Sequence, residues 1–143
     1  MKNILFLCTG NSARSVMAEA YANYAGAGRW RAYSAGSQPT GKVNPFALAT
    51  LRWADIPAGE PSSKSWDVFA GDDAPKMDLI VTVCDSAAGE TCPIWPGAPR
   101  MEHWGFPDPA AAEGSDEEKL AVFQRIFQAI RSRIDRFLLE EDA

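Results

Sequence analysis

The sequence predicts an α/β fold in which helices flank a parallel sheet, organised as one domain over residues 1–143. Short apolar segments that suit buried strands, such as 79–83, alternate along the chain with segments whose apolar residues recur at helical spacing. This alternation is typical of parallel sheets whose strands are joined by short right-handed crossovers. A chain of 143 residues is long enough to bury a core, and it contains no internal repeat.

The first half of the chain is expected to hold two strands and two helices. Residues 3–8 contain the apolar run 4–7 and are expected to form the first strand, and helical spacing predicts a helix over 12–24 that two glycines bring to an end. A second strand is expected over 31–35, before a loop rich in Gly, Pro and Ser. The next helix is expected over 45–54, because an asparagine N-cap is followed by proline at the first helical position.

The second half begins with a turn-rich stretch in which a short helix is expected near 66–70. The clearest strand is 79–83, whose β-branched and apolar residues suit a central position buried on both faces. A long loop over 85–99 leads to a last strand at 100–104. A Ser-Asp-Glu-Glu capping box then opens a long amphipathic helix over 116–139.

The loop between the first strand and the first helix combines a candidate nucleophile with a candidate anion site; it reads Cys8-Thr9-Gly10-Asn11-Ser12-Ala13-Arg14-Ser15. Backbone N–H groups in such a loop converge on one point and attract a tetrahedral oxyanion. Arg14 adds a planar fork suited to bidentate contact. The same field favours the thiolate of Cys8, and we expect the hydroxyl of Ser12 or Ser15 to lower the pKa of this thiol further.

Three side chains distant in sequence are candidates for the same site. Asp108 lies between two prolines on a stiff loop, which suits a general acid or base. Cys84 and Cys8 each end a strand, so both are expected at the carboxyl edge of the sheet, where open α/β folds bind ligands. Cys92 follows on a loop long enough to fold back, and three thiols at one edge can relay a disulfide by exchange. The alternative is that Cys84 is a core cysteine and Cys92 an unremarkable loop thiol.

Composition and charge limit the classes of partner and the cellular compartment that we expect. Apolar residues make up 46% of the chain and charged residues 23%, with a net charge of -5, which argues against nucleic acid or an anionic membrane as partner. The first apolar run is too short for a signal peptide, and no segment approaches the roughly 20 apolar residues that span a bilayer. We therefore expect a cytoplasmic protein whose three cysteines serve chemistry rather than a disulfide framework.

Together these segments resemble the thioredoxin-coupled arsenate reductases, which share the low-molecular-weight tyrosine phosphatase fold; the matching stretches are 8–19, 33–36, 44–45, 81–84, 92–93, 102–106 and 108–109. The resemblance implies a three-layer sandwich with a four-stranded parallel sheet. It also implies that Cys8 attacks arsenate while Arg14 and the loop amides hold it. Asp108 would donate and accept the proton, and Cys84 and Cys92 would form the redox relay. No metal or organic cofactor is required, and the external reductant would be thioredoxin, or glutaredoxin with glutathione.

Some relatives of this kind bind a potassium ion near the loop, and the matching positions here are Asn11, Glu19, Ser34, Ser65 and Asp67. Ser65 stands where the family pattern has threonine. Elsewhere, Ala13 replaces a cysteine that is not part of the relay, Pro107 replaces an acidic residue, and the spacing from Cys84 to Cys92 is one residue longer than the pattern.

Two other functions use the same loop. A low-molecular-weight protein tyrosine phosphatase would hydrolyse phosphate esters with Cys8 and Asp108 and would need no second thiol. A non-catalytic oxyanion sensor would not need Cys8 as a nucleophile. Cys84 and Cys92 favour the reductase, with arsenate and phosphate-like oxyanions as ligands, and we expect the protein to act as a monomer.

Overall fold

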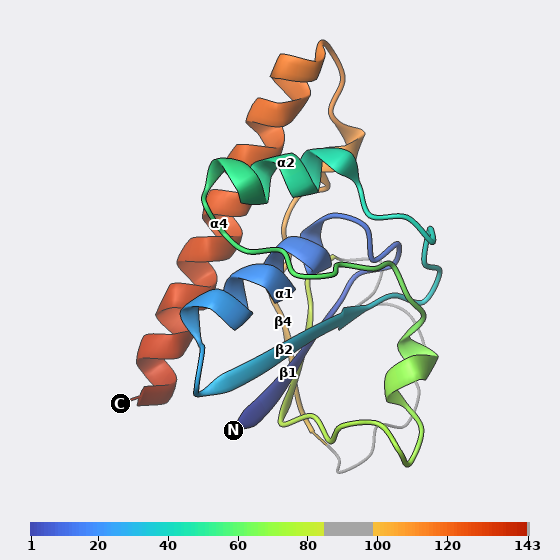
Figure 1. Cartoon of the computed structure of the whole chain (residues 1–143), viewed down its shortest axis with the longest axis vertical. Helices are drawn as coiled ribbons and strands as arrows, with labels where there is room; N and C mark the ends of the chain where they lie inside the picture. The colour runs from blue at the N-terminus through green and yellow to red at the C-terminus, as the bar shows by residue number, and fades with distance from the viewer. Residues whose placement is uncertain (85–98, 143) are drawn as a thin grey trace.

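The computed structural model describes residues 1–84 and 99–142, and Figure 1 shows that its strands run side by side in one sheet. The strands are β1 (Lys2–Leu7), β2 (Trp30–Ala35), β3 (Leu79–Thr82) and β4 (Arg100–His103). Their order is β2-β1-β3-β4, and every neighbouring pair is parallel. Leu7 lies opposite both Ala35 and Thr82, so the carboxyl ends of the three strands meet at one edge.

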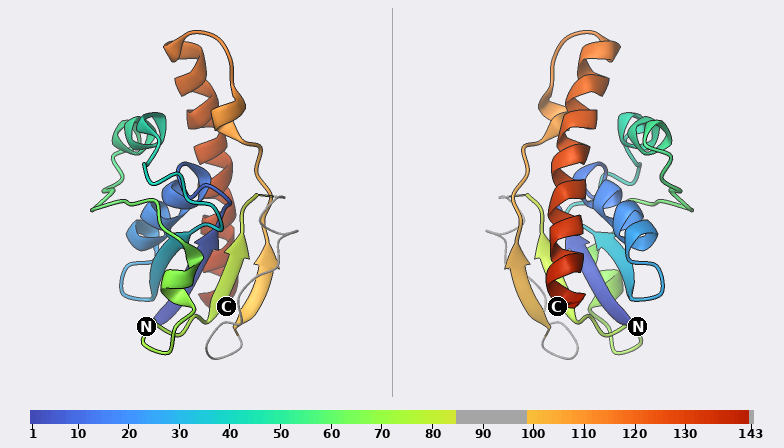
Figure 2. Two further views of the ribbon diagram at one scale, coloured as in Figure 1. Left: turned by 90° about the vertical axis from the view of Figure 1, so that its right-hand side faces the viewer. Right: turned by 90° about the vertical axis from the view of Figure 1, so that its left-hand side faces the viewer.

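One face of the sheet is covered by α1 (Arg14–Ala25), α2 (Pro45–Trp53) and α4 (Asp116–Asp142). Successive side chains of a strand point to opposite faces, so Ile4 and Phe6 pack with these helices while Leu5 and Leu7 face the other way. The second face carries the short 3₁₀ helix η1 (Trp66–Phe69), whose Phe69 packs in the same cluster as Leu5 and Leu7. Figure 2 shows α4 and η1 on opposite sides of the sheet.

Local signals account for the helix starts. The Asn44 side chain accepts the Phe46 N–H at 2.8 Å at the start of α2. At the start of α4 the Ser115 hydroxyl accepts the Glu118 N–H at 3.2 Å, and the Glu118 carboxylate accepts the Ser115 N–H at 3.3 Å. This reciprocal pair is the capping box that the sequence predicts. Asp108 caps the 3₁₀ helix η2 (Pro109–Ala111) by accepting the Ala110 N–H.

The α/β class and the four-stranded parallel sheet between two layers are confirmed, and the differences from the sequence prediction lie at element ends. The first helix begins at Arg14 instead of residue 12, because Asn11 adopts a left-handed conformation (φ 44°) that interrupts helical geometry. The short helix near 66–70 is a 3₁₀ turn, and α4 extends to Asp142. Most of the expected loop over 85–99 falls outside the described residues. Within the described residues, no helix has both the length and the apolar character to span a membrane.

Candidate active site

A cavity of about 340 Å³ lies at the carboxyl edge of β1 and β3, where the loop after β1 meets the start of η2. It brings together four side chains that the sequence nominates, namely Cys8, Arg14, Cys84 and Asp108. Gly10, Ser12 and Ala13 of the loop also line it. Cys92 lies outside the described residues. Cys8 and Cys84 come together because β1 and β3 are parallel neighbours. Cys8 directly follows β1, and Cys84 comes two residues after β3.

Carbonyl groups of the loop after β1 are hydrogen-bonded to a neighbouring segment of the chain. Three of them accept backbone N–H groups from the segment between β2 and α2: Thr9 from Gln38 at 3.0 Å, Gly10 from Thr40 at 3.1 Å, and Ser12 from Asn44 at 2.9 Å. In a planar trans peptide the following N–H points the opposite way from the carbonyl. The N–H groups of Gly10 and Ala13 are therefore directed to the cavity side, as an oxyanion site requires.

Asn11 holds this loop from the inside. It is fully buried, its amide nitrogen donates to the Ser15 hydroxyl at 2.9 Å, and its amide oxygen accepts the Lys64 backbone N–H at 2.8 Å. An asparagine tolerates the positive φ better than most residues. Ser15 thus supports the loop through Asn11, whereas the sequence suggests a contact with the Cys8 sulfur.

Arg14 is oriented by a backbone group that sequence reasoning does not identify. Its NH1 group donates to the Phe106 carbonyl at 2.8 Å, and its NH2 group lies 3.9 Å from Asp108 Oδ1. With one side of the guanidinium held in this way, its remaining N–H groups are available to an anion. Asp108 is half-exposed and lies at the cavity wall, where a carboxyl group can exchange protons with a bound ligand.

The two thiols of the cavity are in contact. Cys84 is hydrogen-bonded to Cys8, and its sulfur also accepts the Thr9 N–H at 3.4 Å. The Thr9 hydroxyl lies 3.7 Å from the same sulfur. Both thiols are buried and not joined in a disulfide. Cys84 therefore belongs to the cavity, and Thr9 contributes to the site through a contact between residues 75 positions apart that no local motif reveals.

The contact with Cys84 changes the pKa that the sequence predicts for the Cys8 thiol. The hydrogen bond with Cys84 and burial raise the pKa of the Cys8 thiol, whereas Arg14 and the Gly10 N–H lower it. The sequence predicts a lowered pKa, because the loop and the arginine are local features and the second thiol is not. The contact with Cys84 thus favours the neutral thiol of Cys8 over its thiolate.

This arrangement predicts slow alkylation of Cys8 by iodoacetamide at pH 7, with a rate that rises as the pH is raised, because only the thiolate reacts. In Cys84→Ala the largest cause of the raised pKa is gone, so labelling at pH 7 should be about tenfold faster. Mass spectrometry of the Cys8 peptide measures the rate. Cys92→Ala retains Cys84 and is the matched control. Equal rates of Cys8 labelling in the two variants would contradict the conclusion that Cys84 raises the pKa of Cys8.

The five positions that match a potassium site take part in hydrogen bonds within the protein. The Ser34 hydroxyl donates to the half-buried Glu19 carboxylate, and the Ser65 hydroxyl accepts the Asp67 N–H at 3.2 Å as the cap of η1. Burial raises the pKa of Glu19, while the Ser34 hydrogen bond and the positive charge of Lys64 lower it. The positive charge of Lys64 faces Glu19 in this cluster. A potassium site at these five positions stays a prediction.

Comparison with known proteins places this geometry in a family. Residues 3–142 match the family described as low molecular weight phosphotyrosine protein phosphatase. The chain is 46% identical over 136 residues to an arsenate reductase of Bacillus licheniformis, covering 95% of this chain and 94% of that protein.

Two solved structures extend the comparison. One is described as an arsenate reductase in the phosphate binding state, with a TM-score of 0.75, 27% identity and coverage of 98% of both chains. A thioredoxin-dependent arsenate reductase of Corynebacterium glutamicum has the same fold, with a TM-score of 0.72, 23% identity, and coverage of 98% of this chain and 61% of that one. The chain belongs to the low molecular weight phosphotyrosine protein phosphatase family, among the members that are arsenate reductases.

Proposed function

We propose that this protein reduces arsenate to arsenite through a Cys8–Cys84–Cys92 relay. The observation that carries the proposal is the contact between the Cys84 and Cys8 thiols inside a cavity that also holds Arg14. A phosphatase of this fold needs a nucleophile, an arginine and an acid, but it has no use for a second thiol. The bacillary relative at 46% identity is named an arsenate reductase, in agreement with this geometry.

The first step forms a bond between sulfur and arsenic. Loop N–H groups and Arg14 hold the oxyanion, and the Cys8 sulfur attacks arsenic. A hydroxyl group of arsenate leaves as water, taking up the proton that Cys8 gives up, and Asp108 at the cavity wall relays that proton. Atoms balance, because a thiol and hydrogen arsenate yield the thiol–arsenate adduct and one water. No oxidation state changes in this step.

The second step transfers two electrons to arsenic. The Cys84 sulfur attacks the Cys8 sulfur, a Cys8–Cys84 disulfide forms, and the pair of electrons of the sulfur–arsenic bond remains on arsenic. Arsenite leaves after taking up the Cys84 proton and further protons from water. Cys84 lies beside Cys8 in the same cavity, so the attacking sulfur is already near its target.

The third step moves the disulfide away from the anion loop. The Cys92 sulfur attacks Cys84, Cys8 leaves as a thiol, and a Cys84–Cys92 disulfide results, which an external dithiol reduces. The relative of Corynebacterium glutamicum is named as thioredoxin-dependent, and we take thioredoxin as the first candidate, with glutaredoxin and glutathione as the alternative. A cycle that starts from three free thiols suits a reducing compartment such as the cytoplasm, and a monomer contains all the groups that it needs.

Arsenate-dependent oxidation of NADPH tests the function. Thioredoxin with its reductase and glutathione with glutaredoxin and glutathione reductase are compared as the reducing system, with and without arsenate. We expect turnover with arsenate and thioredoxin, and only weak hydrolysis of p-nitrophenyl phosphate by the same preparation. The proposal is wrong if neither system oxidises NADPH on addition of arsenate while the phosphate ester is hydrolysed efficiently.

A further inference from the structure

The carbonyl that orients Arg14 belongs to a segment that continues along the sheet after β4 ends. The Trp104 N–H donates to the Thr82 carbonyl at 2.8 Å, and the Phe106 N–H donates to the Val83 carbonyl at 3.1 Å. The segment therefore stays beside the strand that leads to Cys84. The position of the Phe106 carbonyl therefore depends on the contacts that hold residues 104–106 in place.

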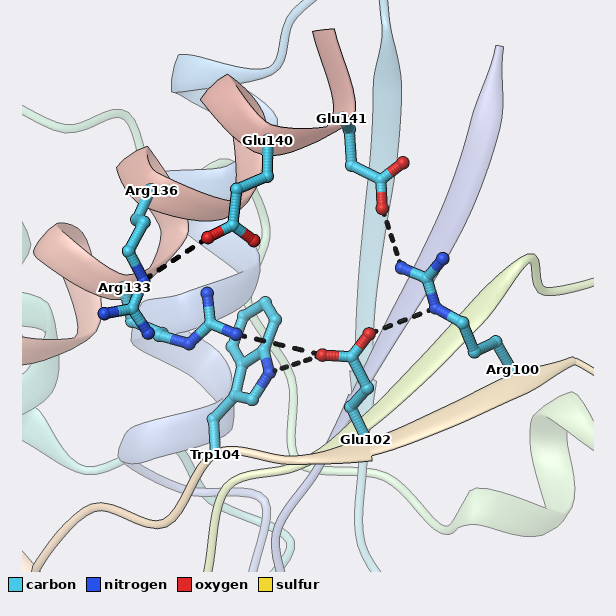
Figure 3. Close-up of polar contacts among 7 residues, drawn as sticks. All are labelled: Arg100, Glu102, Trp104, Arg133, Arg136, Glu140 and Glu141. Atoms are coloured by element: carbon cyan, nitrogen blue, oxygen red, sulfur yellow. Dashed lines mark hydrogen bonds and ion pairs between the residues drawn. The ribbon is translucent and has the colours of Figure 1, made fainter. Parts of the chain in front are cut away.

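Trp104 holds this segment in place on the helical face of the sheet. It is buried, and its ring packs against Phe6 of β1 and Phe137 of α4, with ring centres 6.1 and 5.4 Å apart. The guanidinium of Arg133, also on α4, lies over the indole ring at 4.2 Å from its centre. Figure 3 shows Arg133 reaching from the helix to Trp104.

Glu102 connects the same partners through polar contacts. Its carboxylate accepts the Trp104 indole N–H at 3.0 Å and lies 3.8 Å from the Arg133 NH2 group. Its other oxygen pairs with Arg100 Nε at 3.0 Å (Figure 3). Glu102, Trp104 and Arg133 thus form a closed set of three contacts, which we call the Trp104 anchor. It ties the end of β4 to α4 at a position two residues before Phe106.

The arginine at this position has a cost as well as stabilising contacts. Within the described chain the Arg133 NH1 atom is buried and has no hydrogen-bond partner, which is a cost rather than a gain. The Arg133 side chain is 21% exposed, and its contacts with Glu102 and the Trp104 ring offset that cost. What the guanidinium adds is a flat, oriented surface on the indole, which an aliphatic side chain does not provide.

We propose that Arg133 is a positioning residue for oxyanion binding, acting through Trp104 and the Phe106 carbonyl on Arg14. Arg133 does not line the anion cavity and acts only by fixing the segment that holds Arg14. The inference deepens the proposed function, and it rests on that function only for the identity of the anion that Arg14 binds.

The test compares Arg133→Met with Arg136→Met. Arg136 lies on the same helix and lines the same surface hollow, but it is exposed and its carboxylate partner is Glu140 at 3.7 Å. The dissociation constant for inorganic phosphate is measured by calorimetry, and arsenate KM and kcat are measured in the coupled assay. Arg133→Met should weaken phosphate binding about fivefold, which is part of the loss expected when one charge-assisted contact is removed completely. KM should rise by a similar factor with little change in kcat, because a bound arsenate realigns Arg14 at saturation.

A purely structural role would lower the melting temperature without moving the phosphate affinity of the folded protein. The inference is overturned if folded Arg133→Met binds phosphate like wild type, or if Arg136→Met loses as much affinity. Should Arg133→Met not fold, Trp104→Phe keeps an aromatic ring, although a smaller one, and removes the indole N–H donated to Glu102. This variant must then show the weakened phosphate binding. Phosphate binding needs no reductant, so this result is independent of whether arsenate is reduced.

Discussion

Cys84→Ser should lower steady-state arsenate reduction by at least about a thousandfold, because a hydroxyl cannot take the place of the thiol that attacks the Cys8 sulfur. Binding of the anion should survive, because Arg14 and the other loop contacts do not involve Cys84, and a serine hydroxyl can accept the Thr9 N–H in place of the sulfur. The measurement is NADPH oxidation with thioredoxin, together with the phosphate dissociation constant.

The same variant separates the reductase from a phosphatase. Hydrolysis of p-nitrophenyl phosphate uses Cys8, Arg14 and Asp108, all of which remain, so any such activity should be retained by Cys84→Ser and lost in Cys8→Ser. Multiple turnovers of arsenate by Cys84→Ser with thioredoxin as the only reductant would remove Cys84 from the relay.

Gly36→Ala should lower the free energy of unfolding by about 3 kcal/mol and abolish phosphate binding by the folded protein. A Cβ at this position would lie 2.3 Å from the Thr9 carbonyl oxygen and 2.4 Å from that of Cys8, and backbone atoms cannot move aside as a flexible side chain can. Either β2 or the anion loop must shift, and the loop carbonyls then lose the contacts that turn its N–H groups inward. Urea unfolding and calorimetry with phosphate measure the two effects.

Gly71→Ala is the matched control. Nothing lies within 4 Å of a Cβ built at Gly71, so its effect should stay within about 0.5 kcal/mol and leave phosphate binding unchanged. If Gly36→Ala behaves like this control, the close approach of β2 to the loop is not what holds the anion site open.

Much of the fold was open to prediction because its signals are local. The Asn44 cap, the Ser115–Glu118 capping box and the buried strand around residues 79–83 each depend on neighbours within a few positions. The element ends were less accurate. The first helix starts two residues later than its periodicity indicates, because the conformation of Asn11 is set by contacts with Ser15 and Lys64.

The residues of the candidate site likewise fall into those that local sequence predicts and those that it does not. Cys8, Arg14 and Asp108 can be nominated from short motifs, and Cys84 from its place at a strand end. Gly36, the Phe106 carbonyl and Arg133 cannot, because each acts through a partner that only packing brings close. Glycines, backbone carbonyls and helix-surface arginines are common in any sequence and carry no signal of such a role.

The sequence by itself determined the α/β class and the loop that joins a nucleophile to an anion site. It also determined which distant cysteines are candidates for the relay. Only the tertiary structure decided that Cys84 lies against Cys8, and this contact raises the pKa that the loop alone would lower. The physical reason is that a loop field depends on the adjacent backbone and arginine, whereas the second thiol arrives through the register of β1 against β3.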